Sequence, residues 1–159
     1  MLAIANSMHY ISFMTELNYH TLLRLLQISD ALEERVSGAI SSVHGLSLNE
    51  VFLLMHLDNA PLMRLPRVEL ARRLHVNAST VTRMAAPLEK IGLVSRKSDE
   101  RDARLAFVVL TETGKTRLNE ARTTLNHQAA KIFKDRWSDK DLQQLSDLLG
   151  RLLLHDELS

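Results

Sequence analysis

The chain has 159 residues, of which 45% are hydrophobic and 25% are charged, and it contains no cysteine. This composition is sufficient to bury a core in one domain of ordinary size, which excludes an intrinsically disordered chain. The absence of cysteine excludes disulfides, thiolate metal sites and thiol-based redox sensing.

Targeting and membrane-spanning segments are not expected from the sequence. No apolar run reaches the roughly 20 residues that span a bilayer. The first fourteen residues carry no Lys or Arg, which argues against a secretory signal peptide. We therefore expect a cytoplasmic protein with no membrane partner, folded as a single domain over residues 1–159.

The net charge of +1 hides an uneven distribution of charged residues. Ten basic and five acidic residues lie between Arg64 and Arg104, so this segment carries +5 and the rest of the chain −4. A basic segment between acidic flanks produces a directed electrostatic field rather than a neutral surface. Chance clustering is the alternative that charge alone leaves open.

The first predicted elements are helices separated by turn residues. Apolar side chains recur at helical spacing over about 15–42, and the pair Ser37-Gly38 weakens this helix near its end. Ser47 and Glu50 have the spacing of a capping box, which predicts a short helix through Leu57. Residues 58–61, which end in a proline, then break the pattern.

Two short helices joined by a tight turn are predicted next. The first covers 67–74, with Pro66 well placed at its first position. The second covers 78–91, with Asn77 as its N-cap and Gly92 after its end. The buried face of the first is expected to consist of Val68, Leu70, Ala71 and Leu74.

The periodicity changes to two after these helices, which indicates strands. Residues 93–97 and 104–110 are predicted strands on either side of a polar turn. Thr111 then caps a long helix that extends to about Arg136. Residues 138–141 cap a last helix with leucines at helical spacing.

The order helix, turn, helix, strand, turn, strand is typical of a winged helix-turn-helix. In its second helix, the side chains that pack on the first are expected to be Val81, Met84 and Leu88. The exposed side chains are expected to be Ser79, Thr80, Thr82 and Arg83. Short hydroxyls and one Arg suit entry into the major groove of DNA. A solvated helix face with ordinary capping residues is the alternative.

The turn between the two strands alternates acidic and basic residues. Asp99 or Asp102 can pair with Arg101 and direct it into a narrow minor groove, where negative potential is concentrated. A plain solubilising loop is the alternative. With the basic residues of the strands, the expected DNA-contacting residues of the wing are Arg96, Lys97, Asp99, Arg101 and Arg104.

Five short motifs lie in order between Val68 and Leu118: ELARRL, STVTR, LEKIGLV, DERDAR and LTETG. Together they resemble the MarR family of bacterial transcriptional regulators. The resemblance implies a mainly α fold with a winged helix-turn-helix lobe at 47–110, a two- or three-stranded β wing, and dimerisation helices over 15–45 and 112–156. By position it implies major-groove contacts from Ser79, Thr80, Thr82 and Arg83, and a minor-groove contact from Arg101 with Asp99 as its partner.

Two features depart from the barest family pattern. Pro87 lies inside the second helix of the motif, where it removes a backbone hydrogen bond and should bend the helix. It lies beyond the turn that enters the groove, so altered packing is expected rather than lost DNA binding. The first fourteen residues are longer than the family needs.

The resemblance implies a homodimeric repressor of transcription that binds a palindromic operator in double-stranded DNA and is relieved by a small aromatic or acidic effector. Leucine-rich helix faces at both ends of the chain favour a dimer, because they need a partner surface. Burial of these faces against the core of the same chain is the alternative. Candidate effector-binding residues, taken from helices that line the pocket in relatives, are His20, Arg24 and Met55. The alternatives are an activator or architectural DNA binder without ligand input, and a winged helix that binds a protein partner.

Motifs of catalysis and of cofactor binding were not found. The seven histidines form no His-x-x-x-His pair, and the five glycines form no phosphate-binding loop. No nucleophile elbow is present. We therefore expect neither an enzyme nor a cofactor or metal site, with a zinc site built from dispersed His and Asp as the alternative.

Overall fold

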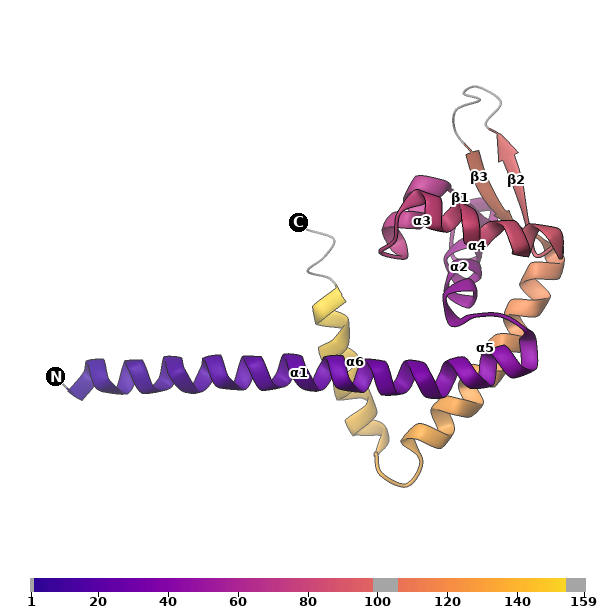
Figure 1. The fold of residues 1–159 in the computed structure, drawn as a ribbon. Coiled ribbons are helices and arrows are strands. Elements are labelled where there is room, and N and C mark those ends of the chain that lie inside the picture. The colour runs from indigo at the N-terminus through magenta and orange to yellow at the C-terminus, as the bar shows by residue number, and fades with distance from the viewer. Residues whose placement is uncertain (1, 99–105, 154–159) are drawn as a thin grey trace.

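The computed structural model describes residues 2–98 and 106–153, with side chains in the first helix described from Thr15 onward. In chain order its elements are α1 (Leu2–His44), α2 (Leu48–Asp58), the 3-10 turn η1 (Pro61–Met63), β1 (Arg64–Pro66), α3 (Arg67–Arg73), α4 (Ala78–Lys90), β2 (Val94–Ser98), β3 (Ala106–Leu110), α5 (Glu112–Phe133) and α6 (Asp139–Leu153). Figure 1 shows a lobe that contains α2, α3, α4 and the sheet, and long helices α1, α5 and α6 that extend away from it. The predicted mainly helical, winged-helix fold is confirmed.

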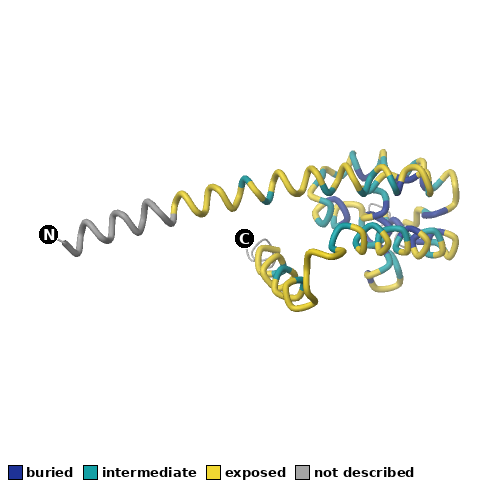
Figure 2. Tube along the Cα trace, turned by 90° about the horizontal axis from the view of Figure 1, so that it is seen from below, coloured by how far each residue is buried: buried dark blue, intermediate teal, exposed yellow. Residues whose placement is uncertain are grey.

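Helix α1 is longer at both ends than the predicted range of 15–42. No proline or glycine precedes Gly38, so nothing in residues 2–37 opposes helix formation. The helix also continues past Gly38 to His44, where Gly45 takes a φ of 65° and ends it. Figure 2 shows burial only toward the C-terminal end of α1, where Ile40 is fully buried.

The core of the lobe is built around α2. The predicted capping box is present: Ser47 Oγ accepts from the Glu50 backbone N–H at 3.2 Å, and Ser47 N–H donates to Glu50 Oε2 at 2.8 Å. This cap fixes the start of a helix whose buried side chains are Val51, Leu53, Leu54 and Leu57. The core therefore includes an almost continuous apolar stretch of the chain.

Helices α3 and α4 form the predicted helix-turn-helix. His75 lies in the turn with a positive φ of 52°, and Val76 N–H donates to Ala71 O at 3.0 Å. The expected burial of Val68 is wrong, because that side chain is 70% exposed while Leu70 and Ala71 reach the core. Helix α4 runs without interruption across Pro87, and the bend expected at this residue stays a prediction.

The sheet has the strand order β1-β3-β2, with both pairs antiparallel. The hairpin of β2 and β3 was predicted, and the expected two- or three-stranded wing allowed for a third strand, but the residues of β1 were not identified. Its three residues include Pro66, which has no backbone N–H to donate, and a proline is tolerated in an edge strand such as β1. Leu65 of β1 lies opposite Val108 and both side chains are buried, so this short strand closes one side of the core.

The sheet and α5 approach each other closely at Gly114. The Thr111 hydroxyl accepts from Gly114 N–H at 2.9 Å, which confirms Thr111 as the N-cap of α5. The same hydroxyl lies 2.6 Å from Gly92 O and 3.0 Å from Leu93 O. A Cβ on Gly114 would overlap the carbonyl oxygen of Leu93, so only glycine fits there without a shift of the backbone.

The C-terminal helices leave the lobe. Helix α5 ends at Phe133, earlier than the predicted Arg136, because Lys134 takes an extended backbone conformation. Ser138 caps α6 as predicted, through a 3.3 Å hydrogen bond from Asp141 N–H to Ser138 Oγ. Among the helices of the described part, none combines the length and the apolarity needed to cross a membrane.

Candidate nucleic-acid interface

The exposed start of α4 is organised by Asn77. The side-chain oxygen of Asn77 accepts from the Thr80 backbone N–H at 2.8 Å, from the Thr80 hydroxyl at 2.9 Å and from the Ser79 hydroxyl at 2.6 Å. The predicted N-cap is therefore confirmed. While both hydroxyls donate to Asn77, the lone pairs of Ser79 and Thr80 are left as hydrogen-bond acceptors for a ligand.

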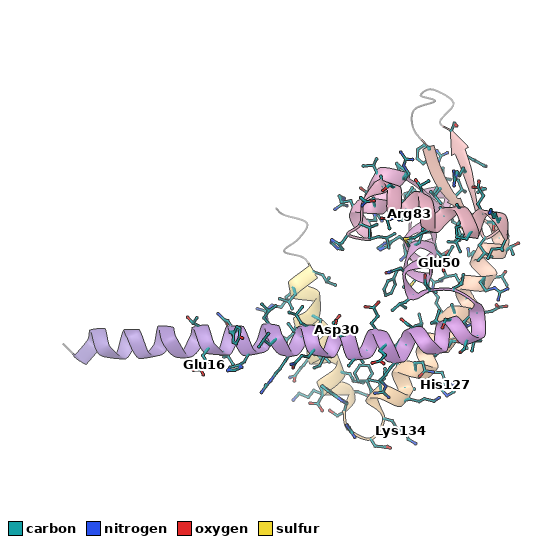
Figure 3. All side chains as sticks on the ribbon, viewed as in Figure 1. Glu16, Asp30, Glu50, Arg83, His127 and Lys134 are labelled. Atoms are coloured by element: carbon teal, nitrogen blue, oxygen red, sulfur yellow. The ribbon has the colours of Figure 1, made fainter. Side chains whose placement is uncertain are left out.

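Arg83 supplies hydrogen-bond donors next to these acceptors. Its side chain is exposed, and Nη2 donates to Thr80 Oγ1 at 3.2 Å. Within residues 2–98 and 106–153, no carboxylate forms an ion pair with Arg83. Since a guanidinium has five N–H groups, most of its donors stay available. Figure 3 places Arg83 on the lobe, far from Lys134 in the turn between α5 and α6.

Thr82 is less available than Ser79 and Arg83, which are both exposed. It is half-buried, its hydroxyl donates to Ala78 O at 3.0 Å, and it accepts from Arg67 Nη1 at 3.3 Å. Val81 and Leu88 are buried on the opposite face of α4, as predicted. Thr82 therefore lies at the edge of the exposed face and is linked to α3 through Arg67.

The two basic residues of β2 have different environments. Arg96 Nε lies 3.0 Å from Glu89 Oε2, so an ion pair connects the base of the wing to α4. Lys97 is exposed and lies opposite Phe107, on the other face of the strand from Arg96. Arg64 lies with its guanidinium carbon 4.8 Å from the centre of the Phe107 ring. The sheet thus presents cations on both of its faces.

The turn of the wing lies outside the described residues. Asp99, Arg101 and Arg104 all belong to it, so the predicted minor-groove contact and its acidic partner stay predictions.

A cluster of charge in α3 is internally compensated. The Glu69 carboxylate accepts from Arg72 Nε at 3.0 Å and from Arg73 Nε at 2.7 Å. These hydrogen bonds, Arg72 first, lower the pKa of Glu69 to about 2, so Glu69 is ionised and balances part of the charge of both arginines. On α2, burial, followed by the charges of Arg73 and His75, lowers the pKa of His56 below its ordinary value.

Arg67 was not among the residues that the sequence predicted to contact DNA. The expected DNA contacts were confined to α4 and the wing, whereas Arg67 is the first residue of α3 and contacts Thr82 of α4. The only signal in the sequence was its place in the basic segment, which does not separate it from the paired arginines of the same helix.

Comparison with known proteins decides the family. A sequence model of the MarR family matches residues 46–105. The chain is 32% identical over 111 residues to the HTH-type transcriptional repressor YetL of Bacillus subtilis (strain 168). The aligned region covers 68% of this chain and 66% of YetL. It is 30% identical over 107 residues to the uncharacterised HTH-type transcriptional regulator YxaD of the same strain. This aligned region covers 67% of this chain and 73% of YxaD. The chain belongs to the MarR family of transcriptional regulators.

The fold of this MarR-family chain is similar to that of solved members. One is Sco3205 from Streptomyces coelicolor, a MarR family transcriptional regulator whose crystal structure is of a complex with DNA. The two chains superpose with a TM-score of 0.74 at 22% sequence identity, covering 84% of each. At this sequence identity the likeness concerns the fold, and it covers most of both chains.

The three candidate effector-binding residues of this MarR-family chain do not converge. Met55 packs against the core of the lobe, where Ile40 of α1 is also buried. His20 precedes Ile40 by 20 residues of helix, which corresponds to about 30 Å along α1. His20 is exposed and lies 3.8 Å from Glu16, and Arg24, one turn further on, is exposed as well. Within one chain, these residues do not share a cavity with Met55.

An open groove of about 320 Å³ lies instead where α1, α2 and α5 meet. Its lining consists of Ser29, Leu32, Glu33, Val36, Leu48, Asn49, Phe52 and Leu125. Phe52 is 40% exposed although it is aromatic. This groove joins the long helices to the lobe, and sequence periodicity gave no sign of it because its lining comes from three distant segments.

Proposed function

We propose that this protein binds double-stranded DNA sequence-specifically through α4 and thereby regulates transcription. The observation that carries the proposal is the Asn77-centred network, which holds acceptors on Ser79 and Thr80 next to the donors of Arg83. Acceptors match the exocyclic amino groups of adenine and cytosine, and an Arg fork matches O6 and N7 of guanine. These groups lie in the first turns of the second helix of a helix-turn-helix, the part that enters the major groove in such motifs.

The electrostatics of the lobe support this function. Arg67 of α3 contacts α4 through Thr82, and Lys97 and Arg64 add two more cations on the neighbouring sheet. Phosphate contacts from such residues fix the position of a protein on the duplex, while base contacts provide specificity. The lobe therefore offers both kinds of contact.

We propose that the protein acts as a homodimer in which α6 contacts a second copy. No residue of α6 is buried within the chain, although Leu148, Leu149 and Leu152 are 56%, 40% and 57% exposed. On α1, Leu22 and Leu26 are more than half exposed as well. Apolar faces of this kind favour a partner surface. A two-fold axis would present two copies of α4 to a palindromic operator.

We further propose that the regulator is a repressor relieved by a small aromatic effector in the groove between α1, α2 and α5. The name of the relative YetL, a transcriptional repressor, supports the first part. Exposed Phe52 and the neighbouring aliphatic side chains support an aromatic ligand, whereas Glu33 disfavours an acidic one at that position. An effector in the groove would change the orientation of the lobe relative to the long helices. The affinity for DNA would fall as a result.

The first experiment measures binding of the purified chain to the intergenic DNA beside its own gene. Fluorescence anisotropy of a labelled duplex at several salt concentrations gives the affinity and its salt dependence, and a shuffled duplex of equal composition serves as the control. We expect binding that is selective for the intergenic duplex and that weakens steeply with salt. Equally weak, nearly salt-independent binding to both duplexes would exclude this function and favour a winged helix that binds protein.

The effector proposal has a separate test. A panel of small aromatic compounds is added to the preformed complex, and release of the duplex is followed by anisotropy. A Phe52→Ala variant should bind DNA normally but lose the response to any compound that releases the wild-type protein. If no compound changes the affinity of the wild-type protein, ligand relief is rejected and the DNA-binding function stands.

A further inference from the structure

Arg67 is an exposed cation that points toward α4 without a carboxylate partner. Its Nη1 donates to the Thr82 hydroxyl at 3.3 Å. In the part of the chain that the structure describes, no ion pair includes Arg67. The other two arginines of α3, Arg72 and Arg73, both pair with Glu69. Arg67 is therefore the arginine of α3 whose charge is not compensated there.

A small hollow of about 50 Å³ adjoins this side chain, between α3, α4 and the sheet. Its lining includes the polar residues Arg67, Thr82 and Arg96 and the apolar residues Val81, Ala85 and Val108. The volume suffices for a water molecule or for an oxygen of an anion, but not for a nucleobase or an organic effector. Two arginines from different elements thus line a space that fits one small polar group.

We propose that Arg67 binds a phosphate of the DNA backbone at this hollow, next to the groove that α4 enters. The proposal rests on the DNA-binding function proposed above. A guanidinium matches a phosphate with two parallel N–H groups, and Arg67 uses one of its donors on Thr82. Because Arg67 is hydrogen-bonded to Thr82 of α4, its contact with the phosphate fixes how deeply α4 enters the major groove. A phosphate contact does so without distinguishing one base sequence from another.

The test compares how the DNA affinity of three variants depends on salt. Arg67→Gln removes the charge, Arg67→Lys keeps it, and Lys134→Gln removes a cation from the exposed turn between α5 and α6, far from α4 (Figure 3). Each phosphate neutralised adds about 0.9 to the slope of log affinity against log salt, so a dimer with two copies of Arg67→Gln loses about 1.8. A fourfold rise in salt then weakens wild-type binding about 12-fold more than binding by this variant.

We expect Arg67→Gln to lower this slope on the operator and on a shuffled duplex alike, because a phosphate contact is independent of sequence. Arg67→Lys should keep most of the slope, and Lys134→Gln should match the wild type. Thermal unfolding followed by circular dichroism should be the same for all variants, since both side chains are exposed.

Two results would overturn the assignment while the wild-type chain still binds DNA. One is an unchanged slope and affinity in Arg67→Gln. The other is a lower affinity with an unchanged slope, which would show that Arg67 acts only by orienting Thr82. Absent or salt-independent DNA binding by the wild-type chain would overturn the DNA-binding function itself, and this assignment with it.

Discussion

Replacement of Gly114 by alanine tests the close approach of the sheet and α5. The new Cβ would overlap Leu93 O and lie 2.8 Å from Leu110 Cδ1. The Leu93 carbonyl is held in place, because Thr111 donates to it from its backbone N–H at 3.1 Å and lies within hydrogen-bond distance through its hydroxyl at 3.0 Å. Overpacking costs about 1–3 kcal/mol and one lost hydrogen bond about 1 kcal/mol. Alanine regains about 1 kcal/mol of helix propensity, so we expect a net loss of about 2 kcal/mol.

Thermal unfolding at a fixed protein concentration measures this loss. For a chain of this size, about 2 kcal/mol corresponds to a melting temperature lower by about 4–8 °C. Gly38→Ala is the matched control, because Gly38 is an exposed residue inside α1 and a Cβ added to it would meet no atom within 4 Å. This control should be as stable as the wild type or up to about 1 kcal/mol more stable. A Gly114→Ala chain that melts at or above the wild-type temperature would refute the steric argument.

Three further predictions concern the site, the charge cluster and the dimer. Arg83→Ala should weaken operator binding by about 1–3 kcal/mol and relax base preference in competition anisotropy; wild-type affinity would remove Arg83 from the base-contacting set. The Glu69 pairs stabilise the fold above the ordinary pKa of 4.5, and this contribution is lost as pH falls toward the folded pKa of about 2. As pH is lowered between these two values, the urea concentration at the unfolding midpoint should therefore fall less for Glu69→Gln than for the wild type. An equal fall in both proteins would contradict the pairing. Leu148→Glu combined with Leu152→Glu should give a monomer by analytical ultracentrifugation with much weaker operator binding, and a persistent dimer would place the interface elsewhere.

Local signals in the sequence predicted most elements of the lobe. Caps at Ser47, Asn77 and Thr111 are short-range features, since each side chain bonds to a backbone N–H three residues later. Strand β1 gave no such signal, because three residues carry no periodicity and become a strand only by pairing with β3. Helix α1 begins earlier than the predicted residue 15, because residues 2–14 contain no proline or glycine that would interrupt a helix.

The exposed residues of α4 were predictable, whereas the proposed effector groove was not. Helical periodicity alone puts Val81 and Leu88 inside and leaves Arg83 exposed. The groove requires α1, α2 and α5 to meet, which is a property of the tertiary structure. Periodicity also failed at Val68, because a helix of seven residues buries too few side chains to define a full face.

The positions of the carboxylates decide which cations of the basic segment are available to DNA. The pairing of Glu69 with Arg72 and Arg73 follows from helical spacings of three and four residues, which a sequence reveals. The pairing of Glu89 with Arg96 joins a helix to a strand, and only the fold shows it. A cation paired with a carboxylate releases fewer counterions from DNA than an unpaired one. The net charge of the segment therefore overstates its electrostatic attraction for a duplex, and a cation without a carboxylate partner that reaches a phosphate, as proposed for Arg67, should contribute more to the salt dependence than a paired one.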